Sequence, residues 1–133
     1  MYEFYYNQAM EYYKKAVDNG DEKAKNRIKL LESKRQVDDA FYKSALEVKN
    51  QIKSIEYYNN GIKYAEQGLY TQAINAYSEA IRINPNYKDA INNRGAVYFN
   101  NLHEKEKACA DFRKACDLGN NLGCDNFIKV GCD

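Results

Sequence analysis

Residues that interrupt a helix are scarce in this sequence. Its 133 residues include one proline, Pro85, and seven glycines. Apolar residues also recur at steps of three and four, the spacing that places side chains on one face of a helix. Near the N-terminus, Ala9, Met10, Tyr13 and Ala16 form such a stripe. Few breakers combined with helical spacing predict an all-α protein.

Short turn signals divide the chain into about seven helices. Gly20 can take the left-handed conformation that ends a helix, and Asp21 can cap the helix that follows. Pro85 ends another helix, because the residue before a proline leaves helical space. The predicted helices are residues 8–17, 22–33, 36–69 as one or two helices, 71–83, 87–100, 104–118 and 120–130.

Residues 36–69 leave two alternatives open. An apolar stripe runs through the segment, and no glycine or proline precedes Gly61. The segment could form one helix of about 30 residues, or two helices with a tight bend near Asn50. The unbroken stripe favours the single helix.

The charge of the chain excludes several classes of function. Twenty Lys and Arg residues face nineteen Asp and Glu residues, so the net charge is +1. This balance provides no positive electrostatic field that would attract nucleic acid. No apolar run approaches the ~20 residues of a membrane span. The N-terminus has no basic tip followed by an apolar stretch, so it does not read as a signal peptide. We expect no nucleic-acid partner, no membrane insertion and a cytoplasmic location, or a periplasmic or secreted one if a signal peptide was removed and the cysteines are oxidised.

A spacing pattern of 34 residues begins at Ser54, and a second copy begins at Lys88. Gly61 and Gly95 share one position of this pattern, where a first helix would touch a second helix closely. Small alanines and one aromatic residue follow in each second helix. The pattern consists of Tyr57, Gly61, Tyr64, Gly68, Tyr70, Ala73, Tyr77, Ala80 and Pro85 in the first copy, and of Gly95, Tyr98, Ala108, Phe112 and Ala115 in the second.

This spacing resembles the tetratricopeptide repeat (TPR). The resemblance implies an α-solenoid of antiparallel helix pairs, wound into a right-handed superhelix. It divides the chain into a degenerate N-terminal region (1–53), two repeats (54–87 and 88–121) and a C-terminal capping helix (122–133). All four segments belong to one domain, because each helix pair leaves an apolar face that only the next pair can cover.

The family resemblance also implies a function, which is binding a peptide or helix on the concave side. The first helix of each pair lines this groove, and no enzymatic activity is expected. Asn59 and Asn93 stand where peptide-binding members bond the ligand backbone, although both could equally be ordinary exposed polar residues. The groove positions are Ile55, Tyr58, Asn59, Ile62, Ala65, Glu66, Asp89, Asn92, Asn93, Ala96, Phe99 and Asn100.

A second hypothesis is structural. Ala9, Tyr13 and Ala16 reproduce the pattern of a second helix, so the chain begins with half a repeat. The unpaired face of this half-repeat needs a cover, which could be the long helix, a ligand or a second copy of the chain. In the last case the chain would be a homodimer, formed through the N-terminal half-repeat and the long helix.

All four cysteines lie in the last 25 residues. Cys116 and Cys124 flank a helical turn, and Cys109 and Cys132 are centred on the same turn, so two disulfides could form across an antiparallel pair. The string around Cys116 and Cys124 also resembles Sel1-like repeats, in which such a pair is bonded. The alternative is four reduced, buried thiols in a reducing compartment.

No motif for catalysis or cofactor binding is present. His103, the single histidine, lies in a predicted turn without a nucleophile in the neighbouring sequence. A zinc site using all four cysteines is not expected, because Cys109 and Cys116 would lie roughly 10 Å apart along one helix. We therefore expect no catalytic residue, no metal site and no cofactor.

Overall fold

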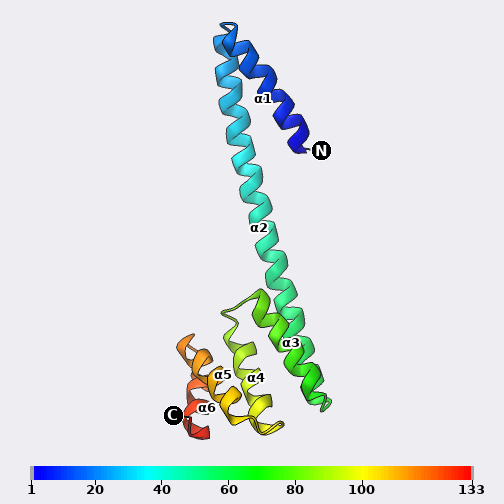
Figure 1. The fold of residues 1–133 in the computed structure, drawn as a ribbon, viewed down its shortest axis with the longest axis vertical. Coiled ribbons are helices and arrows are strands. Elements are labelled where there is room, and N and C mark those ends of the chain that lie inside the picture. The colour runs from blue at the N-terminus through cyan, green and yellow to red at the C-terminus, as the bar shows by residue number, and fades with distance from the viewer. Residues whose placement is uncertain (1, 133) are drawn as a thin grey trace. The chain divides into compact units, whose positions relative to one another are not determined.

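A computed structural model describes residues 2–132, and within this range it contains six α-helices and no strand (Figure 1). The all-α prediction is confirmed. The helix bounds are α1 Tyr2–Asp18, α2 Glu22–Glu66, α3 Tyr70–Ile83, α4 Lys88–Asn100, α5 Lys105–Asp117 and α6 Asn121–Val130. The chain divides into two compact units, residues 1–47 and residues 48–133.

The long helix α2 is the main departure from the predicted helices. Residues 36–69 were expected to be helical on their own, but the helix begins at Glu22 and ends at Glu66. The predicted break between residues 33 and 36 is therefore wrong, as is the alternative bend near Asn50. One consequence is that six helices form instead of about seven.

The turns of the chain explain why α2 continues without a break. Positive φ angles occur at Gly20, Gly68, His103 and Gly119, in four of the five turns between the described helices, and the α3–α4 turn at Asn84 and Pro85 has none. In the degenerate N-terminal region, Phe41 and Val48 stand at the pattern positions of the two alanines, Ala73 and Ala80 in the first repeat. Gly68 stands five residues before Ala73, and the residue five before Phe41 is Gln36. A residue with a Cβ resists positive φ, so Gln36 favours continued helix.

The same comparison holds at the second place where α2 could have turned. Gly119 stands four residues after Ala115, and Ile52 stands four residues after Val48. The β-branched Ile52 is poorly suited to the left-handed conformation that Gly119 adopts at φ 81°. Gln36 and Ile52 therefore disfavour the left-handed turns that form at Gly68 and Gly119.

Unit one is a helical hairpin whose turn repeats that of the C-terminal hairpin. In both, an αL glycine ends the first helix: the N–H of Gly20 donates to the Val17 carbonyl at 2.9 Å, and that of Gly119 donates to the Cys116 carbonyl at 2.8 Å. The Asp21 carboxylate accepts from the N–H of Lys23 at 3.0 Å, as expected for a cap. Sequence similarity between residues 9–20 and 108–119 accompanies the shared geometry, including alanine, aromatic and alanine at equal spacing.

Little of unit one is buried. Met10 and Ala24 are its buried apolar residues among those described, whereas Phe4, Tyr5 and Tyr12 are each more than 60% exposed. Arg35 on α2 lies over the Tyr6 ring at 4.7 Å and pairs with Glu3 at 3.4 Å. These exposed contacts contribute little to the stability of the hairpin.

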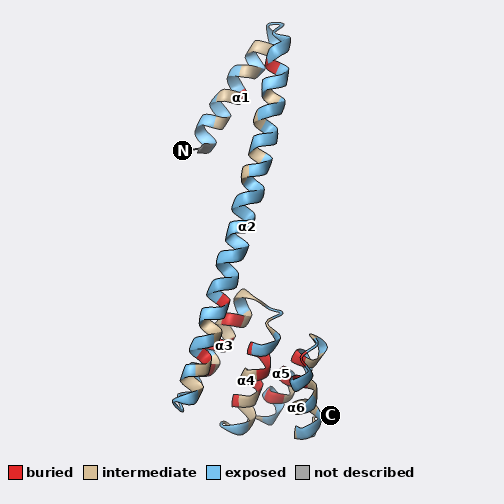
Figure 2. Ribbon diagram, turned by 180° about the vertical axis from the view of Figure 1, so that it is seen from behind, coloured by how far each residue is buried: buried red, intermediate tan, exposed pale blue. Residues whose placement is uncertain are grey.

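In unit two, the end of α2 and helices α3 to α6 form a stack in which each helix packs on the next. Burial concentrates here (Figure 2), with Ala73, Ala80, Ala90, Ile91, Ala108 and Ala115 fully buried. The prediction for Gly61 and Gly95 is confirmed. A Cβ on Gly61 would lie 2.5 Å from the Tyr77 ring, and a Cβ on Gly95 would lie 3.0 Å from the Phe112 ring.

Two disulfides join the last helices of unit two. Cys116 bonds Cys124 with the two Cα atoms 4.6 Å apart, and Cys109 bonds Cys132 with the two Cα atoms 5.5 Å apart. These are the two pairings that the antiparallel geometry allowed. The alternative of four free thiols does not hold in this structure, because no cysteine is free.

Candidate protein-interaction site

The predicted groove residues lie on α2 and α4, the two first helices of the repeats. Their exposure differs widely. Ile55, Asn59, Glu66, Asp89 and Asn100 are exposed, and Tyr58, Ile62, Ala65, Asn93, Ala96 and Phe99 are half-buried. Five of the twelve side chains are thus open to a ligand and six are open in part.

Asn92 does not belong to an accessible groove. It is only 3% exposed, because its Oδ1 accepts a hydrogen bond from Asn126 Nδ2 of α6 at 3.1 Å. A buried amide must be hydrogen-bonded within the protein, and Asn126 satisfies this requirement. The prediction that Asn92 faces a ligand is therefore corrected: this residue joins α4 to α6.

Asn93 also makes a contact within the protein. Its Nδ2 donates to the hydroxyl oxygen of Tyr58 at 3.2 Å, which joins α4 to α2. Asn126 donates to Asn92 in the same way one repeat later, so consecutive first helices are tied by equivalent side chains. The sequence signal was the recurrence of asparagine at positions 59, 93 and 126, spaced by 34 and 33 residues.

Asn59 is the member of this series that stays exposed. No helix precedes α2 in the repeat stack of unit two, so Asn59 has no Tyr58-like neighbour to bond. Its amide can both donate and accept, which suits the peptide backbone of a ligand. Of the two asparagines predicted to bond a ligand, Asn59 presents the whole amide, and Asn93 presents mainly its oxygen.

A cluster of three tyrosines forms the floor beside these amides. The Tyr58 ring lies 4.9 Å from the Tyr87 ring and 6.0 Å from the Tyr77 ring, measured between centroids. Burial raises the pKa of each of the three hydroxyls above its ordinary value. The hydroxyls therefore remain neutral donors and acceptors across the physiological range.

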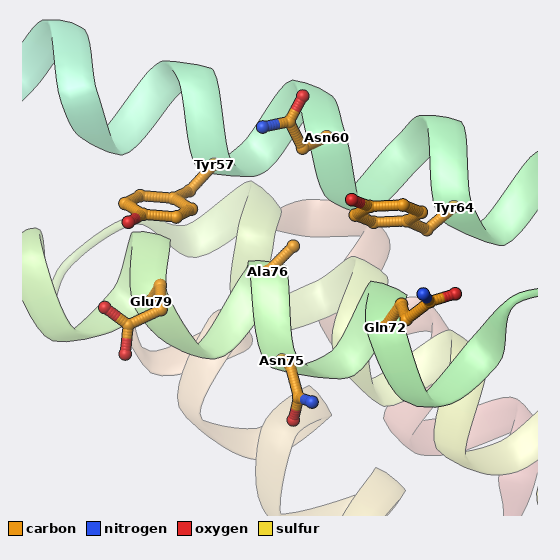
Figure 3. Close-up of a pocket in the computed structure, with 7 residues that line it drawn as sticks. All are labelled: Tyr57, Asn60, Tyr64, Gln72, Asn75, Ala76 and Glu79. Atoms are coloured by element: carbon orange, nitrogen blue, oxygen red, sulfur yellow. The ribbon is translucent and has the colours of Figure 1, made fainter.

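A second concave feature, which the sequence did not predict, lies between α2 and α3 (Figure 3). Tyr57 and Tyr64 extend from α2 toward α3 over a groove of about 270 Å³. The remaining lining residues are Asn60 of α2 and Gln72, Asn75, Ala76 and Glu79 of α3. We call this hollow the end groove.

One repeat later, the surface equivalent to the end groove is covered by a helix. Ile91 and Arg94 of α4 occupy the positions of Tyr57 and Asn60, 34 residues later. There Ile91 is 0% exposed, and Arg94 donates to Ser78 of α3 at 3.0 Å. A preceding helix thus covers the equivalent surface, and the end groove is the open first face of the stack.

Arg94 also forms the one ion pair between the described residues of unit two that is largely buried. Its Nε and Nη2 donate to the two carboxylate oxygens of Asp111 at 2.8 and 2.7 Å. This bidentate hydrogen bonding raises the pKa of Arg94. The contacts with Asp111 and Ser78 make it a structural link among α3, α4 and α5, and sequence reasoning missed it.

The remaining candidates for chemistry are the single histidine and the metal-ligating side chains. His103 is exposed in the turn between α4 and α5, with φ 58°. No group of three or more His, Cys, Asp or Glu residues among residues 2–132 is arranged to hold a metal ion. Nor is any helix in this range both long enough and apolar enough to cross a membrane.

Comparison with known families relates part of the chain to a described repeat. The family model described as TPR repeat matches residues 61–101, which include the end of α2, all of α3 and all of α4. A search of curated proteins found no match to the chain. The matched segment contains Gly61, Gly95 and the groove residues of α4.

Proposed function

We propose, from the tetratricopeptide repeats that this chain carries, that it is a non-enzymatic protein–protein interaction module. Repeats of this family generally act through their surfaces. The ligand would be a peptide or a helix, bound in the groove formed by α2 and α4. The observation that carries the proposal is that α2 exposes Ile55 and Asn59, and that α4 leaves Phe99 half-buried among its groove residues.

The chemistry of this groove favours a largely uncharged ligand. Tyr58 and Ile62 are apolar or neutral, and Asp89 is engaged by Asn120, whose Nδ2 donates to Asp89 Oδ1 at 2.8 Å. A groove that binds the terminal carboxylate of a ligand needs Lys or Arg side chains, and Tyr58, Ile62 and Asp89 provide no positive charge. An amphipathic segment with a neutral apolar face suits the row better.

A capture experiment tests the groove. The full-length chain, with its disulfides intact, is used as bait in a lysate of the native host. The Asn59→Ala and Asn93→Ala variants are compared with Asn26→Ala, an exposed asparagine in unit one. We expect the two groove variants to lose captured proteins that Asn26→Ala retains. Equal capture by all three variants would show that the groove does not bind the partner.

Self-association is the second candidate function, because α2 exposes an unusual number of large apolar side chains. Leu30, Val37, Phe41, Tyr42, Leu46, Val48, Ile52 and Ile55 are each 48–71% exposed. Such a surface marks an interaction site more often than a solvated face. Light scattering across a dilution series measures whether the chain forms a dimer, and a monomer at every concentration would remove this candidate.

A further inference from the structure

One face of α2 within unit two has the spacing of a coiled-coil seam. Val48, Ile52, Ile55, Asn59 and Ile62 follow one another at alternating steps of four and three residues. Val48, Ile52 and Ile55 are 52%, 55% and 48% exposed, and Asn59 is exposed as well. We call residues 48, 52, 55 and 59 the α2 seam, because Ile62 packs in part against the core of unit two. Alternating steps of this kind are typical of two helices that pack along their length.

We propose that the α2 seam pairs with the α2 seam of a second copy of this chain, with the two helices antiparallel. The pairing places Ile52 against Ile55 of the second copy, and Val48 against Asn59 of the second copy. Both contacts occur twice, because a two-fold axis relates the copies. This inference rests on the self-association candidate and specifies its surface and register.

The charges beside the seam select this orientation. Lys49 follows Val48, and Glu56 follows Ile55. Because the two residues are one heptad apart, they lie on the same flank of α2. In the antiparallel pair these flanks meet, and Lys49 lies beside Glu56 of the second copy, again twice. A parallel pair would place Gln51 beside Glu56 and Ser44 beside Lys49, which gives no pair of opposite charges.

A neighbouring antiparallel register is less favourable. A shift of one helix by seven residues would place Val48 against Ile52 of the second copy. Lys49 would then lie beside Lys49 of the second copy instead of Glu56, and like charges on facing flanks repel. Charge complementarity thus points to one occupant and one register for this surface.

Pairing would also affect the groove. Ile55 and Asn59 belong both to the α2 seam and to the predicted groove, so a second copy would cover two groove residues. A ligand that needs Asn59 would then compete with the second copy. Peptide binding and self-association are alternatives at this end of α2.

Crosslinking of two single-cysteine variants tests the register. Val48→Cys and Asn59→Cys are prepared separately in the full chain, whose four native cysteines are disulfide-bonded. The two variants are mixed, oxidised and analysed by intact mass under non-reducing conditions. Antiparallel pairing predicts a crosslink between the two different variants. In a pair formed by two Val48→Cys chains, the introduced thiols would lie roughly 16 Å apart along the helices and should not react.

Each other outcome contradicts a defined part of the inference. Crosslinks formed only within each variant would show a parallel pair and overturn the proposed orientation. A dimer by light scattering without any crosslink would overturn the seam but leave self-association standing. A monomer at every concentration would overturn both.

Charge reversal gives an independent test that does not depend on thiols. Lys49→Glu or Glu56→Lys alone should raise the dissociation constant of the dimer roughly tenfold, because two pairs become repulsive. The double variant Lys49→Glu/Glu56→Lys should restore the original constant. Failure of the double variant to restore it would overturn the flank contact.

A matched apolar substitution completes the set. Ile52→Lys, at a position that is 55% exposed within one chain, should abolish the dimer and preserve the helical circular dichroism signal. Ile128→Lys on α6, at a position that is 76% exposed, should leave the dimer intact. Equal dimerisation of the two variants would exclude the α2 seam as the interface.

Discussion

Close approach at single glycines sets the spacing of the helix pairs. Gly61 is buried against the ring of Tyr77, and Gly95 lies against Phe112. The aromatic ring of the second helix occupies the space that a side chain on the first helix would need. The degenerate N-terminal region has Lys29 where the spacing of the pattern requires glycine, twelve residues before Phe41. A tight helix pair cannot form at that position.

Replacing Gly61 with alanine should destabilise the protein. The new Cβ would lie 2.5 Å from Tyr77 Cε1, so the ring or the helix must shift. We expect a loss of about 1–3 kcal/mol in the free energy of unfolding, because overpacking outweighs the better helix propensity of alanine. Urea denaturation measures the loss. An exposed Ser44→Ala control should change little, and an unchanged midpoint for Gly61→Ala would contradict the close packing.

The Arg94–Asp111 pair should behave as a buried pair. The Asp111 side chain is 8% exposed, so Arg94→Met leaves a carboxylate without its charge partner. We expect a loss of about 2–4 kcal/mol in the free energy of unfolding. The double variant Arg94→Met/Asp111→Leu should recover much of that loss. If the double variant were as unstable as the sum of both single variants, the proposed cause would be wrong.

The tyrosine cluster predicts a stability limit at alkaline pH. The folded-state pKa values of Tyr58, Tyr77 and Tyr87 are raised above 10.0, chiefly by burial. The unfolded chain therefore loses these protons first, so stability is intact below about pH 10 and falls as the pH rises through the folded values. Urea denaturation at pH 9 and pH 11 measures this fall. Tyr58→Phe should make the fall shallower, and an identical fall in that variant would exclude Tyr58 as a contributor.

At the scale of the element, turn residues decide where helices end. Gly20, Gly68 and Gly119 supply positive φ, and His103 supplies it at φ 58°. At the positions inside α2 that correspond to Gly68 and Gly119, the chain has Gln36 and Ile52. Hydrogen bonding along the helix then continues through both positions, which produces a helix of 45 residues.

The disulfides should stabilise the last helix pair by different amounts. Cys109–Cys132 spans 23 positions of the chain and Cys116–Cys124 spans 8. The longer loop loses more entropy in the unfolded state, so removing it should cost about 3–4 kcal/mol, against about 2–3 for the shorter loop. Paired Cys→Ala variants and urea denaturation measure both costs. A larger cost for the shorter loop would show that chain entropy is not the dominant effect.

At the scale of the whole molecule, the two units differ in how much they bury. Unit one buries Met10 and Ala24, whereas unit two buries the larger side chains of Tyr77, Ile91 and Phe112. Stability in a repeat protein accumulates by stacking, and unit one contains only one hairpin. The two units should therefore differ in their free energies of unfolding.

Hydrogen exchange should resolve this difference. In the Ile52→Lys variant, which removes the proposed dimer contact, amides of residues 25–47 should exchange through local opening well before amides of α4. Mass spectrometry of proteolytic peptides measures the rates. Equal protection of residues 25–47 and of α4 would show that the two units unfold together.

The groove was predictable only in part, for a reason visible at Asn92 and Asn93. Position in the repeat correctly placed both residues on a first helix, together with Asn59. The sequence could not show which amide meets a partner from the neighbouring helix, because that depends on how consecutive repeats approach in space. The end groove was missed for the same reason: an open first face exists only where no preceding helix packs.

Interactions between near neighbours in the chain can be predicted from the sequence, and most contacts between distant side chains cannot. The scarcity of breakers determined the all-α class, because helix propensity acts through neighbouring residues of the chain. The 34-residue spacing predicted the helix pairs, because it matches a glycine on one helix with an aromatic residue on the next. Tertiary structure decided that Asn92 is buried and that Arg94 bonds both Asp111 and Ser78. Both outcomes depend on which side chains of another helix lie within reach, which no local pattern records.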